Sequence, residues 1–206
     1  SLFWHATSQS LEQQFVAVKI PIFKGINGYR ALVVRSTDKR ATNHITQLNE
    51  LNHVRFGEVR GSVERHILAE NDLQIVETSK QRNLKYMLDG GRFDLMALPL
   101  YGLTQQSKMV WQEEGLDLAE LDGVVLSYSN PVYFFTNSVS LARDIEVGLN
   151  GLVTSGDMDL LLTAQPEMNE ALKSLALFNG NIIEVPNPLL PESAPIARSE
   201  LWVQAK

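Results

Sequence analysis

Apolar and polar positions alternate in two different ways along this chain. Up to about residue 136, short apolar runs are separated by polar segments of helical length. The strands predicted from these runs are 1–7, 28–35, 54–57, 73–77, 93–98, 123–128 and 132–136. The helices predicted between them are 8–14, 43–51, 62–70, 79–88 and 103–114. Strands that alternate with helices in this way predict an α/β fold with parallel strand pairs.

The final third of the chain is predicted to be mostly helical. Apolar residues recur at helical spacing from Leu141 to Leu152. We predict helices over 140–154, 157–163 and 167–178, followed by a short strand at 182–185. The closely spaced prolines of 186–191 forbid a helix, so the tail is expected to be extended.

Composition narrows the possible classes of protein. A chain of 206 residues is long enough for one domain or two small lobes with a real core. The net charge of -6 argues against a nucleic-acid surface, which requires a basic stripe. The absence of cysteine excludes disulfides, thiolate metal sites and cysteine nucleophiles. The four histidines lack metal-ligand spacing, and neither a P-loop nor a Gly-x-Ser-x-Gly turn is present, so we predict no metal and no cofactor.

Three groups of residues have a distinctive order and spacing. The first is 4–8 (WHATS) followed by 18–30 (VKIPIFKGINGYR), and the second is 87–94 (MLDGGRFD). The third is 131–137 (PVYFFTN) followed by 179–191, which ends in EVPNPLLP. Together they resemble the type II periplasmic solute-binding proteins, in the amino-acid-binding-like branch, over essentially the whole chain.

The resemblance implies an α/β fold of two lobes, with mixed sheets flanked by helices and a solute bound between the lobes. The first lobe would comprise 1–27 and 130–206, and the second lobe 28–129. Hinges are expected near 25–28 and 129–131, and closure would be a hinge motion. Family members have further strands and helices ahead of the first strand seen here, so the first lobe is expected to be incomplete.

The resemblance also implies a cellular location and partners. Such proteins are exported to the periplasm and bind a small-molecule solute, although no signal peptide is visible in this chain. An ABC permease or a sensor would be the protein partner, and no nucleic acid is expected. A homodimer through the incomplete first lobe is a further expectation.

The first predicted contact with a solute is the turn after the opening strand. In family members that bind amino acids, hydroxyl groups here are followed by an arginine that clamps the ligand carboxylate. The hydroxyls correspond to Thr7 and Ser8, but Leu11 stands at the arginine position. The alternative is that Thr7 and Ser8 only cap the turn.

The second predicted contact is the turn that links a strand to a helix at 57–62. Free backbone N–H groups at a helix start favour an anion. Arg60, Gly61 and Ser62 are therefore candidate ligand-binding residues, although the charge of Glu58 would oppose an anion. The alternative is an ordinary turn in which Ser62 caps the helix.

The aspartate that would bind a ligand ammonium group is not evident in the sequence. Pro99 stands near the position where amino-acid binders place an aspartate, and we expect Asp94 to be structural, pairing with the backbone or Arg92. Aromatic side chains near strand ends could instead form the walls of a binding site. These are Trp4, Tyr29, Tyr101, Tyr128 and Tyr133. Each of them, taken singly, is more typical of a core position.

The function predicted from these features is non-enzymatic binding of a small polar or anionic solute, in transport or sensing. Two alternatives remain open. An enzyme on the same fold would need a catalytic acid, base or nucleophile, for which His5 and Glu58 are the candidates. A partner-docking role would be favoured by an exposed apolar sheet edge at 2–6, because unpaired edges recruit strands.

Overall fold

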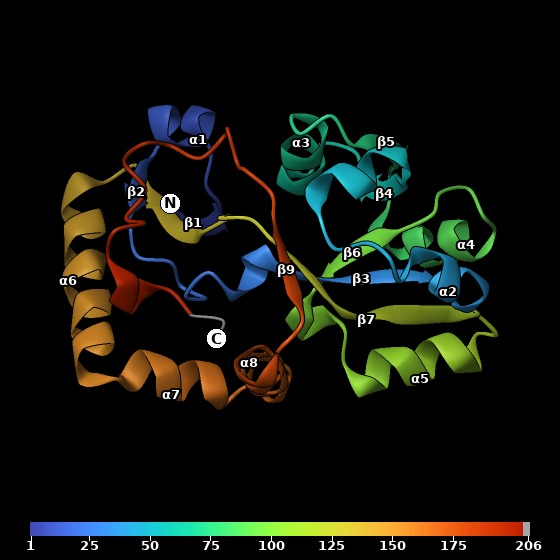
Figure 1. The fold of residues 1–206 in the computed structure, drawn as a ribbon. Coiled ribbons are helices and arrows are strands. Elements are labelled where there is room, and N and C mark those ends of the chain that lie inside the picture. The colour runs from blue at the N-terminus through green and yellow to red at the C-terminus, as the bar shows by residue number, and fades with distance from the viewer. Residues whose placement is uncertain (204–206) are drawn as a thin grey trace. The chain divides into compact units, whose positions relative to one another are not determined.

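The computed structural model describes residues 1–203, which form two compact units (Figure 1). Unit 1 comprises Ser1–Gly28, Ser129–Phe178 and the segment that begins at Leu189. Unit 2 comprises Tyr29–Tyr128 and Asn179–Pro188. The predicted first lobe contained all of 130–206, whereas the contacts assign 179–188 to the second unit. The reason is strand pairing, since the strand in this segment joins a sheet of unit 2.

Unit 1 contains a three-stranded antiparallel sheet in the order β1-β8-β2. Its strands are β1 (Leu2–Ala6), β8 (Val132–Thr136) and β2 (Val16–Val18), and α1 (Gln9–Gln14) connects β1 to β2. The opening strand, predicted over 1–7, is confirmed. Because β1 is an edge strand, Leu2 remains 50% exposed and Trp4 59% exposed.

Three helices complete unit 1, and their predicted positions agree closely with the structure. They are α6 (Val139–Ser155), α7 (Asp157–Thr163) and α8 (Pro166–Leu177), with α6 the longest (Figure 1). The hydroxyl of Ser138 caps α6 by accepting a hydrogen bond from the Leu141 backbone. Gly156 separates α6 from α7 with φ at +82°, a left-handed conformation that glycine adopts without a Cβ penalty.

Unit 2 contains a four-stranded mixed sheet and a separate two-stranded parallel sheet. The strand order of the larger sheet is β6-β3-β7-β9, where β3 is antiparallel to both neighbours and β7 is parallel to β9. The strands are β3 (Tyr29–Arg35), β4 (Arg55–Val59), β5 (Gln74–Thr78), β6 (Met96–Pro99), β7 (Leu118–Ser127) and β9 (Asn181–Glu184). Parallel strand pairs, which the alternation of strands and helices predicted, are present as β4–β5 and β7–β9.

The helices of unit 2 are short. They are α2 (Lys39–Thr42), α3 (Val63–Ala69), α4 (Leu84–Asp89) and α5 (Gln105–Glu113), together with 3-10 turns at Ser36–Asp38, Leu48–His53, Gln81–Asn83 and Leu100–Gly102. The predicted helix over 43–51 is wrong. The Glu50 carboxylate accepts hydrogen bonds from the backbone N–H groups of Thr46 and Gln47, which favours the 3-10 turn instead. The start of the helix predicted over 79–88 is also wrong, since α4 begins only at Leu84.

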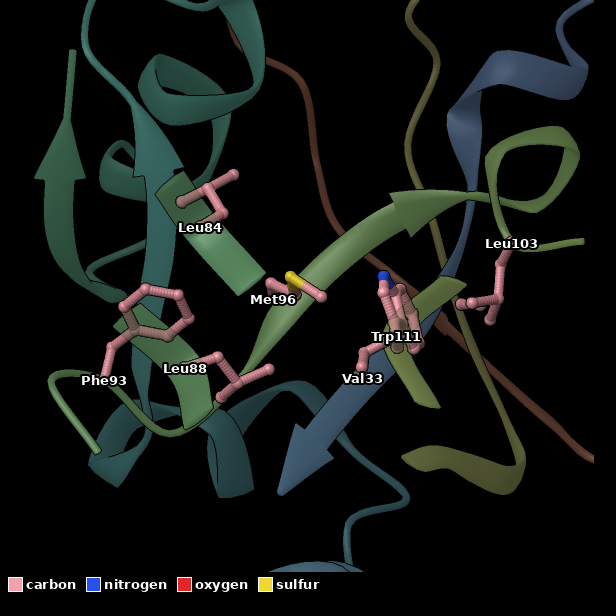
Figure 2. Packing of buried hydrophobic residues seen from close by; sticks show 8 residues of the cluster. Val33, Leu84, Leu88, Phe93, Met96, Leu103 and Trp111 are labelled. Atoms are coloured by element: carbon pink, nitrogen blue, oxygen red, sulfur yellow. The ribbon is translucent and has the colours of Figure 1, made fainter. Parts of the chain in front are cut away.

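The core of unit 2 is an apolar cluster along β3 and β6 (Figure 2). Its buried members are Ala31, Val33, Leu84, Leu88, Phe93, Met96, Leu103 and Trp111. Gly57 on β4 is needed for close packing, because a Cβ there would lie 2.1 Å from Cζ of the fully buried Phe93 ring. None of the described helices is long and apolar enough to span a membrane.

Candidate functional site

Polar side chains gather at one end of the strands of unit 2. Arg30 lies near the start of β3, in register with Pro99 at the end of β6 and with Leu126 near the end of β7. Glu58 lies near the end of β4, and Tyr128 follows β7 directly. Ligands of open α/β sheets bind at the carboxyl ends of strands, so this end of the unit is a natural place for a site.

Arg30 is the centre of this group and is only 6% exposed. Its Nη2 lies 2.6 Å from Oε1 of Glu64 on α3, which makes a charge-assisted hydrogen bond. Its guanidinium carbon lies 5.3 Å from the centroid of the Tyr128 ring, within cation–π range. The carboxylate of Glu64 therefore turns toward this buried charge.

Glu58 supplies a second carboxyl group to the same cluster and is 7% exposed. Burial, assisted by the nearby charge of Glu64, raises the pKa of Glu58 to about 7. Arg30 and hydrogen bonds from the Val59 backbone and Ser62 hydroxyl act in the opposite direction but do not cancel the effect of burial. Glu58 therefore changes its charge near neutral pH.

Two polar atoms of the cluster have no hydrogen-bond partner within residues 1–203, namely the Tyr128 hydroxyl oxygen and Arg30 Nε. Tyr128 is 3% exposed, and burial raises the pKa of its hydroxyl, which stays protonated. Buried polar groups are nearly always paired in native proteins, so such atoms require an explanation. The half-buried Tyr101 belongs to the same electrostatic group, since burial raises the pKa of its hydroxyl and the charges of Arg30 and Glu64 also act on it. We call Arg30, Glu58, Glu64, Tyr101 and Tyr128 the Arg30 cluster.

The predicted turn at 57–62 makes contacts of its own within unit 2. The Arg60 side chain is 72% exposed, and its Nε lies 3.0 Å from Oε2 of Glu77. Gly61 adopts φ of +78°, and Ser62 caps α3 by accepting a hydrogen bond of 3.0 Å from the Arg65 backbone. The capping role considered for Ser62 is therefore present.

The predicted turn in unit 1 is engaged with a neighbouring carboxylate. The Thr7 hydroxyl donates to Oε1 of Glu12 at 2.7 Å, and Ser8 caps α1 by accepting from the Leu11 backbone at 3.2 Å. The other oxygen of Glu12 lies 3.2 Å from Lys19 Nζ. Both hydroxyl groups thus have partners inside the unit.

The predicted aromatic residues fall in both units. In unit 1, Trp4 packs edge-on against Phe23 with ring centroids 6.0 Å apart, and Tyr133 is fully buried. Burial also raises the pKa of Tyr133. In unit 2, Tyr29 is half-buried at the start of β3, directly before Arg30. Of the aromatic candidates, the structure places Tyr101 and Tyr128 in the Arg30 cluster.

Asp94 has a structural contact, and of its two predicted partners the backbone is confirmed, since the Arg55 N–H donates to its carboxylate at 3.0 Å. Arg55, not Arg92, donates to Asp94 from Nε at 2.9 Å and from Nη2 at 2.7 Å. These hydrogen bonds hold the pKa of Asp94 below its usual range. Across residues 1–203 no group of three or more histidine, aspartate or glutamate side chains is arranged to hold a metal ion.

Arg30 and Glu64 were missed in the sequence. One signal was available for Arg30, because it is a charged residue within an otherwise apolar strand, and charges are rarely buried without a partner. Its partner could not be found in the same way, since Glu64 lies 34 residues further along the chain on a different element.

Comparison with known proteins shows the fold. No protein-family model matches the chain, and no characterised protein sequence matches it. An arginine transport periplasmic binding protein from Legionella pneumophila superposes with a TM-score of 0.54 at 12% identity, covering 78% of this chain and 69% of that one. The predicted mixed α/β fold of type II periplasmic binding proteins is therefore confirmed.

Two further solved structures share this fold. One is a periplasmic His/Glu/Gln/Arg/opine family-binding protein from Silicibacter pomeroyi in complex with lysine, with a TM-score of 0.54 at 11% identity and coverage of 77% of this chain and 65% of that chain. The other is an amino acid ABC transporter substrate-binding protein from Streptococcus pneumoniae bound to L-arginine. It superposes with a TM-score of 0.52 at 19% identity, covering 81% of this chain and 66% of that chain. The chain thus spans about two thirds of the length of these proteins.

Proposed function

We propose that this chain is a non-enzymatic, extracytoplasmic solute-binding module that recognises a small polar or ionised solute through unit 2. The observation that carries the proposal is the Arg30 cluster, a buried set of ionisable groups at the carboxyl ends of strands with polar atoms left unpaired. Perturbed ionisable groups of this kind concentrate at functional sites. The fold, shared with amino-acid-binding proteins, supports the same class of function.

The predicted partners fit the same proposal. An ABC permease or a sensor would receive the signal of solute binding, as in proteins that the chain resembles. A homodimer or another protein partner would use the edge strand β1, whose Leu2 and Trp4 are exposed. Edge strands with apolar, uncharged side chains are open to pairing with a further strand.

The alternative of an enzyme rests on Glu58, whose pKa of about 7 would suit a general acid or base. The second candidate, His5, is exposed on β1 in unit 1 and has a ring nitrogen 2.8 Å from the Ala6 carbonyl oxygen. A binding role needs only the charges and hydrogen-bond groups already present, which is why we favour it.

A thermal-shift panel tests the proposed function. The protein is heated with each standard amino acid and with the polyamines agmatine and putrescine. Because a ligand that binds only the folded state stabilises it, at least one member should raise the melting temperature. Tyr101→Ala should abolish that shift, whereas the exposed tyrosine on α4 provides a matched control, Tyr86→Ala, that keeps it. A panel without any shift would contradict the proposal.

A further inference from the structure

The charges of the Arg30 cluster do not balance. The positive charge of Arg30 is already matched by Glu64 at 2.6 Å, and one face of its guanidinium lies over the Tyr128 ring. Glu58 is left as a second carboxyl group, and no lysine, arginine or histidine nitrogen of residues 1–203 lies within 4 Å of it. Ionised Glu58 therefore gives the cluster one surplus negative charge.

This arrangement of charges is unfavourable for binding an anionic solute. Arg60, the cation predicted to attract an anion, points to Glu77 and is mostly exposed. Arg30 is already paired with Glu64, and ionised Glu58 would repel a second carboxylate brought to the unpaired Nε of Arg30. The geometry thus disfavours the anion that the turn at 57–62 led us to expect.

We propose that Glu58 is the specificity-determining residue of the site, where it binds a positively charged ammonium or guanidinium group of the solute and releases its proton. The inference rests on the proposed function and names the class of solute. The proton leaves the Glu58 carboxyl for the solvent as the cation takes its place, so charge in the cluster is conserved.

A second observation supports a ligand here besides the carboxyl groups. The buried Tyr128 hydroxyl interacts electrostatically with Glu58 and has no hydrogen-bond partner within residues 1–203. Its oxygen can accept a hydrogen bond from an ammonium or guanidinium N–H. An aromatic ring beside a carboxylate is also a favourable environment for an organic cation. Tyr128 therefore offers the acceptor that a cationic group would use.

Several other ionisable groups act on Glu58 or on its neighbours, and their effects must be separated from its own experimentally. Arg30 on β3, Glu64 on α3 and Tyr128 after β7 interact electrostatically with Glu58, and Glu77 on β5 is its cross-strand neighbour. Arg65 on α3 contacts Glu77, and Tyr101 after β6 interacts with Arg30 and Glu64. Glu77 is held ionised by Arg60 and Arg65, which lower its pKa. The exposed His66 on α3, whose Nδ1 lies 2.7 Å from the Ser62 carbonyl oxygen, is the remaining side chain to control for.

Calorimetric titration as a function of pH tests the inference. The probes are L-arginine, agmatine, which has no carboxylate, and L-glutamate, each titrated between pH 5.5 and 8.5. Only ionised Glu58 binds a cation. The Kd of agmatine should therefore decrease about tenfold for each unit by which the pH rises toward 7, and it should be constant above pH 7. Titrations in buffers of different ionisation enthalpy should show about one proton released at low pH.

Variants assign the effect to Glu58. Glu58→Gln should weaken agmatine binding at pH 8 and remove its pH dependence, and Glu58→Asp should restore part of both. His66→Gln is the matched control and should keep the wild-type slope. If Glu58→Gln fails to fold, the pH dependence of the agmatine Kd of the wild-type protein still tests the inference.

Two results would overturn the inference, and they are distinguishable. Tighter binding of L-glutamate than of agmatine, weakening as the pH rises, would refute the cation preference while leaving solute binding intact. The absence of binding by all three probes and by the whole thermal-shift panel would refute the proposed function as well.

Discussion

Replacing Glu58 with glutamine is expected to alter the stability of the fold in a pH-dependent way. Burial raises the pKa of Glu58 from its ordinary value of 4.5 to about 7. A carboxyl group with a raised pKa in the folded state contributes stability that is complete below 4.5 and is lost as the pH rises through 7. The rise of the pKa from 4.5 to about 7 corresponds to a loss of about 3 kcal/mol in the free energy of unfolding at high pH. Glutamine remains neutral, so the variant should avoid that loss.

Urea unfolding at pH 5, 6, 7 and 8, followed by circular dichroism, measures this difference. The free energy of unfolding of Glu58→Gln, relative to wild type, should increase by up to about 3 kcal/mol from pH 5 to pH 8. Most of the increase should occur below pH 7.5, with no change in the denaturant slope. A difference that is the same at all four values would refute the reasoning, because Glu58 would then be ionised in both states.

The remaining predictions concern packing and the buried ion pair, and the same urea assay checks them. Glu64→Gln leaves the buried charge of Arg30 without its 2.6 Å partner, so the free energy of unfolding at pH 8 should fall by about 3 kcal/mol. Gly57→Ala forces a Cβ against a fully buried ring and should cost about 1–3 kcal/mol. Gly148→Ala, in open space on α6, is its control and should add up to about 1 kcal/mol. Equal stability of the two alanine variants, or no effect of Glu64→Gln, would contradict these expectations.

Elements defined by a continuous apolar pattern could be predicted from the sequence. The strand at 132–136 and the helix at 157–163 match the structure, and Met158 and Leu162 of the helix are buried. The helix expected at 43–51 failed because a local contact, from Glu50 to the preceding backbone, outweighs helix propensity. The start of β7 at Leu118 was also missed. Apolar and charged residues are mixed in the first half of this strand, and its strand conformation depends on pairing with β3.

The candidate site was predictable only in part. Tyr101, Tyr128 and Glu58 could be singled out because they lie at strand ends, where ligands of this class of fold bind. The contact between Arg30 and Glu64 depends on how two separate elements pack, and no local pattern encodes it. The burial of Glu58, which sets its pKa, likewise arises from tertiary structure alone.

The most direct test of solute recognition by Glu58 is a carbon-13 NMR titration of the side-chain carboxyl groups, assigned by comparison with Glu58→Gln. Without ligand, we predict one glutamate carboxyl that titrates near pH 7. Saturating agmatine should shift that titration to lower pH, because a bound cation favours the ionised form. A Glu58 resonance that titrates near pH 4.5, or one that is unaffected by agmatine and every member of the amino-acid panel, would contradict the role proposed for this residue.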